Sequence, residues 1–177
     1  MLADTLVIIQ QGHVLQVGTP DEIFRSPLTP AVATLIRMSP CWTGILRGSI
    51  SHPSTQQQII MLETTGLSLY ADILTTMPVE IGQTLAFSIR TDEIYVFNSD
   101  KQSIENNKAQ IQPMALVPGR VLRDRSMSTF HNITVQLETG QTLDIPLIAR
   151  EMQSLLITVG SPVVVGIPTS SVHVFRR

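Results

Sequence analysis

One stretch of this sequence occurs twice, and the repeat limits what the chain can fold into. Three pairs of matching blocks define it: 80–97 with 158–175, 62–66 with 137–140, and 47–50 with 118–121. Their offsets are 78, 75 and 71. Such a drift is expected when loops vary in length and strands do not. The chain is therefore predicted to contain two copies of one unit of about 60 residues.

Each copy has the pattern of a half-buried β-strand. Apolar residues occupy every second position of the matching blocks: Leu85, Phe87 and Ile89 in the first copy, and Val163, Val165 and Ile167 in the second. Short strands separated by Gly, Pro, Thr and Ser favour a small closed barrel, because closure removes exposed edges. The predicted fold class is mainly β, with two tandem OB-like barrels of five strands, each closing its own core.

A leader precedes the repeats. Residues 6–9 and 13–17 are predicted to form a hairpin. Thr19 and Glu22 then form the capping box of a helix, which Pro27 ends. A second helix is expected from Pro30 to Met38.

These elements divide the chain into four predicted segments. They are a leader (1–40), a first barrel (41–98), a connector (99–112) and a second barrel (113–177). The leader is expected either to dock on the barrels or to pair with a second copy of the chain, since a lone hairpin is marginal in water.

Composition excludes several classes of protein. A net charge of -2 provides no basic field, which disfavours nucleic acid as a partner. The single cysteine, Cys41, rules out an internal disulfide and a cysteine-rich metal site. No apolar run reaches the about 18 residues that a membrane span needs.

The leader carries a resemblance to a known family. The run Gln16-Val-Gly-Thr-Pro-Asp-Glu-Ile-Phe24 and the later Pro27 resemble the end of the ATPase domain of an ABC importer. The repeats resemble the TOBE domains attached to such ATPases, with Ile89-Arg-Thr-Asp-Glu-Ile94 matching a strand-ending signature. The layout is most similar to molybdate-type ATPase subunits, whose C-terminal part contains related Mop barrels.

This resemblance implies a non-catalytic fragment. The chain has no G-x-x-x-x-G-K-S/T motif, so it has no phosphate-binding loop, and no catalytic residue is assigned. No cofactor is expected here, whereas ATP and Mg²⁺ would belong to the full-length parent. The implied partners are the chain's own ATPase domain, a second ATPase subunit in a homodimer, and membrane permease subunits. The implied location is the cytoplasm, peripheral to the inner (plasma) membrane.

The Mop family implies an oxyanion site, which the second repeat lacks. The family holds molybdate with a Ser-x-Arg-Asn sequence and a lysine on its last strand. Here Gln112, Met114 and Ala115 stand where Ser, Arg and Asn are expected, and Pro168 stands at the lysine position. The neighbouring hydroxyls of Thr169 and Ser170 are the remaining ligand candidates there, but a polar turn at the strand end is the favoured interpretation of them.

The first repeat offers a cation and a hydroxyl instead. Arg90 matches Pro168 at the offset of 78, and Thr43 matches Met114 at 71. Both are candidate anion ligands, and the competing interpretation is that Arg90 pairs with Asp92 or Glu93. No metal ligands are assigned, and His173 is expected to face solvent.

Two functional hypotheses remain. The first is a regulatory and interaction domain of an ABC-importer ATP-binding subunit, which stabilises the ATPase dimer or senses the transported solute. The alternative is a free-standing carrier of a small oxyanion such as molybdate. A carrier has no use for an ATPase-like leader.

Overall fold

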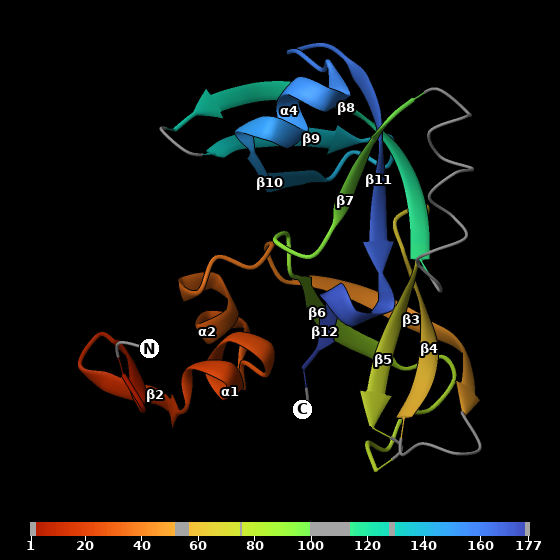
Figure 1. Ribbon diagram of the computed structural model, residues 1–177. Coiled ribbons are helices and arrows are strands. Elements are labelled where there is room, and N and C mark those ends of the chain that lie inside the picture. The colour runs from red at the N-terminus through yellow and green to blue at the C-terminus, as the bar shows by residue number, and fades with distance from the viewer. Residues whose placement is uncertain (1–2, 52–56, 75, 100–113, 128–129, 176–177) are drawn as a thin grey trace.

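The computed structural model describes residues 3–51, 57–74, 76–99, 114–127 and 130–175 (Figure 1). The predicted connector falls almost entirely on residues outside these ranges. Within them, the helices are too short to cross a lipid bilayer. The fold is mainly β, with two five-stranded sheets and a separate hairpin, as predicted.

The leader forms the elements expected of it. They are β1 (Leu6–Gln10), β2 (His13–Gly18), α1 (Pro20–Arg25) and α2 (Pro30–Leu35). The capping box of α1 is confirmed: the Thr19 amide donates to Glu22 Oε2 over 2.8 Å, and the Glu22 amide donates to Thr19 Oγ1 over 3.3 Å. The Oε1 and Nε2 atoms of Gln16 then bond the Leu28 amide and the Ser26 carbonyl, which ties β2 to the helices.

Helix α2 ends three residues before the predicted Met38. Arg37 adopts a left-handed φ of 64°. The Arg37 amide donates to the Thr34 carbonyl over 3.1 Å, and the Met38 amide donates to the Ala33 carbonyl over 3.0 Å. This is the Schellman motif, in which glycine usually occupies the left-handed position. The prediction was wrong because no glycine marks the end of the helix.

The two repeats contribute equivalent sets of strands. The first set is β3 (Trp42–Ser51), β4 (Gln57–Thr64), β5 (Leu67–Leu74), β6 (Thr84–Ile89) and β7 (Tyr95–Asn98). The second is β8 (Met114–Ser126), β9 (Phe130–Leu137), β10 (Thr142–Ile148), β11 (Pro162–Pro168) and β12 (Val172–Val174), with α4 (Ala149–Leu155) after β10 and a 3-10 turn η1 (Thr169–Ser171) after β11.

The last strand of each repeat belongs to the other repeat's sheet. The strand orders are β12-β6-β3-β4-β5 and β7-β11-β8-β9-β10. Val174 pairs with Phe87 of β6, and Val96 pairs with Val165 of β11. Figure 1 shows β7 rising beside β11, and β12 lying beside β6. The prediction that each barrel closes its own core is therefore wrong, because the two repeats exchange strands.

The pairing register confirms one offset and corrects another. Gly82 and Gly160 donate their amides to the carbonyls of Leu46 and Val121, which supports the offset of 78. Leu85 lies opposite Gly44 in β3, and its counterpart Val163 lies opposite Gly119 in β8. The first strands therefore match with Gly44 on Gly119, and the offset of 71 is wrong.

A close backbone approach explains why both matched positions are glycine. A Cβ atom on Gly44 would lie 3.3 Å from the Glu63 carbonyl oxygen, and one on Gly119 would lie 2.8 Å from that of Gln136. The neighbouring strand leaves no room for a Cβ atom at Gly119 and only a tight fit at Gly44. The sequence comparison instead chose Gly48, which lies beside the β-bulge of β3.

Strand β11 is buried on both faces. The alternating pattern had predicted that only one face, with Val163, Val165 and Ile167, would be buried. Val163, Val165 and Ile167 face one core, while Val164 is only 9% exposed on the other face. A Cβ atom on Gly166 would lie 2.6 Å from the Met114 sulfur and 2.8 Å from the Phe97 ring. The strand lies between β8 and β7 and also contacts β5 of the other sheet. It is thus covered where the two sheets meet.

Strand exchange predicts that removing the Phe175 ring destabilises the first sheet. Phe175 is 4% exposed, and its amide donates to the Ala86 carbonyl of β6 over 2.9 Å. We expect Phe175→Ala to lower the free energy of unfolding by about 3–5 kcal/mol. The fluorescence of Trp42, whose ring meets that of Phe87 edge-on at 5.9 Å, reports on the first sheet.

The Trp42 transition and the far-ultraviolet circular dichroism transition should shift together in Phe175→Ala, because neither sheet is complete without the other repeat. Phe24→Ala, at a phenylalanine that is 47% exposed in the leader, is the control and should change little. A Trp42 transition that stays in place would contradict the exchange.

Candidate functional site

Ser39 joins the leader to the end of β6. Its amide donates to the Ile89 carbonyl over 2.8 Å, and its hydroxyl accepts from the Ile89 amide over 2.7 Å. Both residues are buried, at 4% and 0% exposure. Buried backbone groups need such partners, so this pair of bonds fixes where the leader meets the barrels.

Arg90 directly follows Ile89, and both its side chain and its backbone amide have partners. Its Nη2 lies 3.1 Å from Asp92 and its Nη1 lies 2.9 Å from Glu93. The Arg90 amide donates to the Ser171 carbonyl over 2.8 Å. The Arg90 side chain is 15% exposed, so the two carboxylates neutralise a largely buried guanidinium.

His173 is a third point of attachment for the leader. Its Nε2 lies 2.9 Å from the Pro27 carbonyl oxygen, which can only accept, so the ring donates from Nε2. Burial lowers the pKa of His173 below its ordinary value, and the Arg90 guanidinium lowers it further, while the bond to Pro27 acts in the opposite direction. The prediction that His173 faces solvent is wrong, because the leader covers β12.

Docking of the leader leaves one hydroxyl without a partner. Ser88 lies directly opposite His173 in the β6–β12 pair. Its side chain is fully buried, and its Oγ finds no hydrogen-bond partner among the residues that the structure describes.

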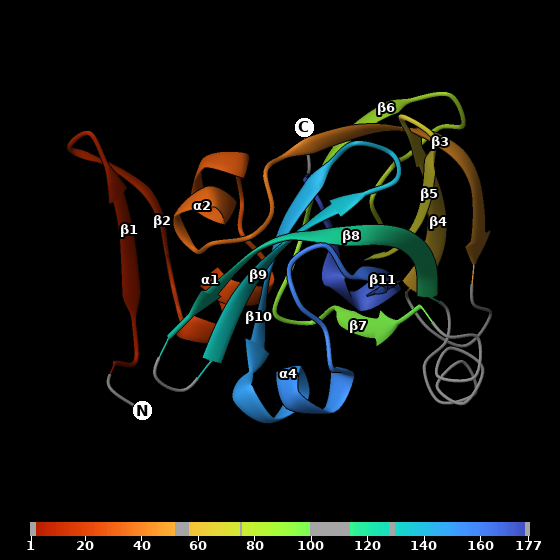
Figure 2. The ribbon, with the colours of Figure 1, turned by 90° about the horizontal axis from the view of Figure 1, so that it is seen from above.

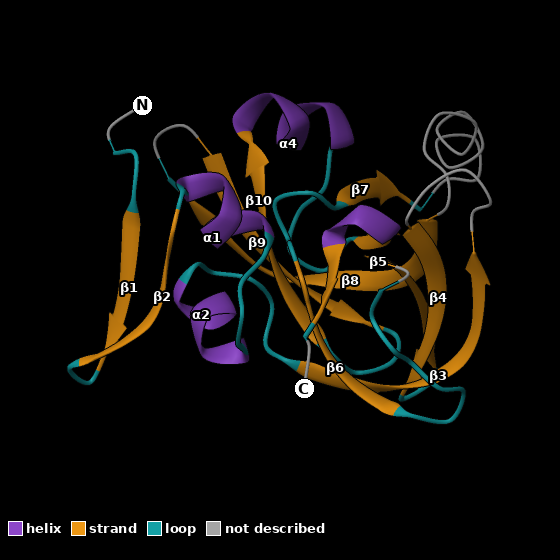
Figure 3. Cartoon of the chain, turned by 90° about the horizontal axis from the view of Figure 1, so that it is seen from below, coloured by secondary structure: helices purple, strands orange, loops and turns teal. Residues whose placement is uncertain are grey.

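A cleft of about 730 Å³ lies between the leader and the second sheet. Its lining comes from three regions of the chain: Phe24 and 36–40 from the leader; 90–92 from the loop after β6; and Arg125, Met127, Phe130, Asn132, Thr142, Asp144 and Pro146 from β8–β10 and the turn after β8. Figure 1 shows these strands above the two helices, and Figure 2 shows α1 and α2 beside them. Seen from below in Figure 3, the hairpin β1–β2 lies on the far side of α1 and α2, and none of its residues lines the cleft.

The second sheet presents a polar face to this cleft. Arg125 lies opposite Asn132, and Arg123 lies opposite Thr134, which in turn lies opposite Asp144. Directly paired residues share one face of a sheet, so these side chains form neighbouring rows on the outside of the barrel. A smaller hollow over Arg123 and Thr134 shares Arg125 and Asn132 with the cleft and extends it.

The charges of the cleft fall into two groups. Arg90 and Asp92 are paired with each other, and Asp144 accepts a hydrogen bond of 2.6 Å from Thr134. The side chains of Arg37 and Arg125 make no hydrogen bond or ion pair with any residue in the described ranges. No cluster of side chains suited to a metal ion forms within those ranges.

The structure places the four predicted ligand residues apart. Arg90 lines the cleft, but Thr43 lies opposite Ala86, four residues back along β6. Thr169 is 5% exposed and donates to Asp72 Oδ2 over 2.7 Å, while Ser170 is exposed on the 3-10 turn. The competing interpretation of Arg90, pairing with Asp92 and Glu93, is what the structure contains.

The register error explains the choice of Thr43. With Gly44 on Gly119, the residue that matches Met114 is Ser39. Ser39 does bond Ile89, the last residue of β6, which precedes Arg90. Sequence reasoning also missed Arg37 and Arg125. The alternation of polar residues along β8–β10 was a signal for Arg125, whereas nothing in the sequence marked Arg37.

Comparison with known proteins supports the resemblance seen in the sequence. The chain is 26% identical to the spermidine/putrescine import ATP-binding protein PotA of Nostoc sp. (strain PCC 7120), over 81% of this chain and 34% of that protein. It is 26% identical to the sn-glycerol-3-phosphate import ATP-binding protein UgpC of Brucella abortus, over 98% of this chain and 40% of that protein. A shorter match, 42% identical over 27% of this chain, is to 13% of the sulfate/thiosulfate import ATP-binding protein CysA of Yersinia pestis.

The fold has a solved neighbour as well. The molybdate-bound structure of the cytoplasmic molybdate-binding protein ModG superposes with a TM-score of 0.64 at 10% identity, covering 77% of this chain and 95% of that one. No family model matches the chain. The chain spans about a third of the length of the PotA relatives it matches. It resembles the C-terminal region of ABC importer ATP-binding subunits, which confirms the predicted resemblance, and its tandem OB-like fold is confirmed too.

The lowered pKa of His173 predicts a loss of stability in acid. Well above pH 6.5, the ordinary pKa of histidine being about 6.5, the ring is neutral in both the folded and the unfolded chain. As the pH falls through that value, His173 becomes protonated in the unfolded chain while it remains neutral in the folded chain. Unfolding therefore becomes more favourable. The free energy of unfolding should therefore fall between about pH 7 and about pH 5, and His173→Gln should flatten this dependence.

Urea denaturation at each pH measures the effect. His13→Gln, at an exposed histidine of the hairpin, is the matched control and should keep the wild-type dependence. Equal slopes for wild type and His173→Gln would show that His173 does not contribute.

Proposed function

We propose that this chain is a regulatory and interaction module of an ABC-importer ATP-binding subunit and is not catalytic on its own. It would act in the cytoplasm, at the inner membrane, through the transporter to which the subunit belongs. Its partners would be an ATP-binding domain, a second ATP-binding subunit and the membrane permease subunits.

An exposed apolar face on the hairpin is the main support for this role. Val7 pairs with Val17, and Ile9 pairs with Val14, so the four side chains lie on one face. They are 50–59% exposed, although side chains of this kind are usually buried. A two-stranded sheet with an uncovered apolar face is marginal alone and is completed by further protein. An ATP-binding domain is the partner that the likeness to import ATP-binding proteins suggests.

The hairpin is tied to the barrels by a series of hydrogen bonds. Gln16, 7% exposed, joins β2 to the segment between α1 and α2. His173 binds that segment at Pro27, and Ser39 binds the end of β6. A partner on the hairpin and a ligand on the barrels would therefore act on one connected body. The coupling between them is a free energy that acts in both directions.

The proposal predicts binding to an ATP-binding protein that lacks its own C-terminal region. A PotA protein truncated by its C-terminal third should bind this chain in trans, as measured by calorimetry. The double variant Val7→Ser/Val17→Ser should weaken binding by at least about tenfold, because it removes apolar area from the contact. Ile81→Ser, at another exposed apolar residue (74%), is the control. Binding that survives the hairpin variant would contradict the proposed contact.

The alternative is a free-standing oxyanion carrier, and the 95% coverage of the molybdate-binding ModG chain favours it. Under this alternative, molybdate, tungstate or sulfate would raise the melting temperature of the chain alone. Arg90 is the first residue to test, and Thr43, Thr169 and Ser170 follow. Arg90→Ala should abolish the stabilisation if Arg90 is a ligand, and stabilisation that persists would remove it from the site.

A further inference from the structure

We propose that the cleft between α2 and the polar face of β8–β10 binds a small organic anion, held from opposite walls by Arg37 and Arg125. The proposal rests on the geometry of the cleft and is independent of the role proposed for the hairpin. It differs from the oxyanion site expected at the strand ends, because neither arginine belongs to that set.

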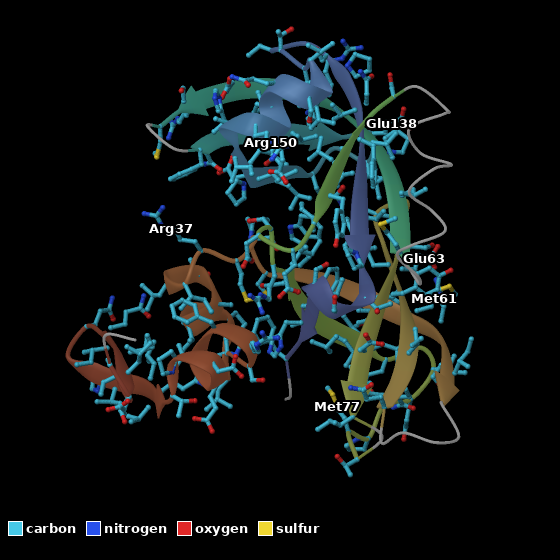
Figure 4. The ribbon with its side chains drawn as sticks, viewed as in Figure 1. Arg37, Met61, Glu63, Met77, Glu138 and Arg150 are labelled. Carbon is cyan, nitrogen blue, oxygen red and sulfur yellow. The ribbon has the colours of Figure 1, made fainter. Side chains whose placement is uncertain are left out.

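Arg37 occupies a position where its backbone is unfavourable. A non-glycine residue in the left-handed region costs about 1–2 kcal/mol, and the Schellman motif normally uses glycine at this place. The side chain is exposed and makes no hydrogen bond or ion pair with the described residues. In Figure 4 it projects from the chain after α2 toward the second sheet. Strained residues of this kind are concentrated at ligand sites.

Arg125 provides the second cation from the opposite wall. It stands in the row with Asn132 and Pro146, next to the row of Arg123, Thr134 and Asp144. Like Arg37, it has no partner within the described ranges. Each guanidinium therefore keeps its planar set of donors free, and that set matches a carboxylate or a phosphate group.

The carboxylates of the cleft do not cancel these charges. Asp92 is engaged by Arg90, and Glu93 adds a second negative charge to the same pair. Asp144 is the remaining acid in the lining, and it accepts from Thr134 on the row beside Arg125. The lining thus contains two guanidinium groups without a partner and one carboxylate that already accepts a hydrogen bond, which favours an anion over a cation.

The rest of the lining indicates a ligand with an organic body. Phe24 and Met38 contribute apolar surface from the leader, and Met127 and Phe130 contribute it from the second repeat. A volume of about 730 Å³ is far larger than a single inorganic anion needs and lies within the range typical of small-molecule sites. The position between two structural units is also typical of such sites.

Calorimetry on the full chain tests the proposal with four probes. Phenyl phosphate combines an anion with an aromatic ring, and citrate supplies carboxylates instead of phosphate. Inorganic phosphate lacks the organic body, and benzyl alcohol lacks the charge. We expect phenyl phosphate or citrate to bind with one site per chain, at least about tenfold more tightly than inorganic phosphate or benzyl alcohol. Which of the two binds more tightly identifies the anionic group.

Arg37→Gly is the decisive variant because it separates binding from folding. Glycine relieves the left-handed strain, so the variant should melt at or above the wild-type temperature. It should nevertheless bind the organic anion at least about tenfold more weakly. Arg125→Gln should weaken binding to a similar extent. Arg150→Gln is the matched control, since Arg150 is an exposed arginine on α4, away from the cleft lining.

Three results would overturn the site. One is the absence of binding by both phenyl phosphate and citrate. Another is binding that neither Arg37→Gly nor Arg125→Gln weakens, or that Arg150→Gln weakens equally. The third is inorganic phosphate binding as tightly as the organic anions, which would remove the organic body from the proposal.

Discussion

The exchange of β7 and β12 between the two sheets determines how the rest of the molecule is arranged. Each sheet has four strands from one repeat, and one of its two edge strands comes from the other repeat. The loop from β6 to β7 and the turn from β11 to β12 must therefore both cross between the sheets. Arg90 and Ser171 lie on these crossings, and their backbone groups bond each other. The leader is attached at the same place through Ser39 and His173.

This arrangement accounts for the position of the cleft. The leader docks on the first sheet, at β6 and β12, while the crossing at residues 90–92 leads up to the second sheet. The space between them is thus bounded by segments that lie far apart in the sequence. Close to the crossing, Arg90 is neutralised by Asp92 and Glu93. On the leader and on β8, the guanidinium groups of Arg37 and Arg125 have no partner among the described residues. The positive charges of the cleft that lack a partner therefore belong to residues outside this crossing.

The sequence was sufficient to predict the fold class, but it could not reveal the exchange. The last strands of the repeats read Tyr95-Val-Phe97 and His173-Val-Phe175, which are almost the same. Because either strand fits either sheet, the pattern of apolar residues does not say which sheet each one joins. The start of α1 in the leader was predictable because its capping box is local. The end of α2 was not, because Arg37 takes a conformation that the sequence would assign to glycine.

The candidate site was harder to predict for a related reason. The β-bulges of β3 and β8 lie at equivalent places, so they do not disturb the match between the repeats, and the error of four positions comes from matching Gly48 instead of Gly44 to Gly119. Because of this error, Thr43 was predicted as an anion ligand in place of Ser39, which matches Met114 in the observed register. Gly44 and Gly119, which a neighbouring strand approaches closely, are the correct pair for aligning the repeats. Their role can be recognised only when the carbonyl groups that approach them are known. That information is held in the pairing and not in either strand alone.

The exchange also sets an order for the assembly of the protein during its synthesis. Residues 84–89 leave the ribosome long before residues 172–174, which are to pair with them. Until then β6 has an open edge in the first sheet, and the nascent chain carries a hydrophobic strand without its neighbour. β7 likewise must wait for β11. Contacts this distant in sequence slow folding, since a long loop has to close before they form. The molecule therefore completes both sheets late and together, and a nascent chain stalled between the repeats would be prone to aggregation.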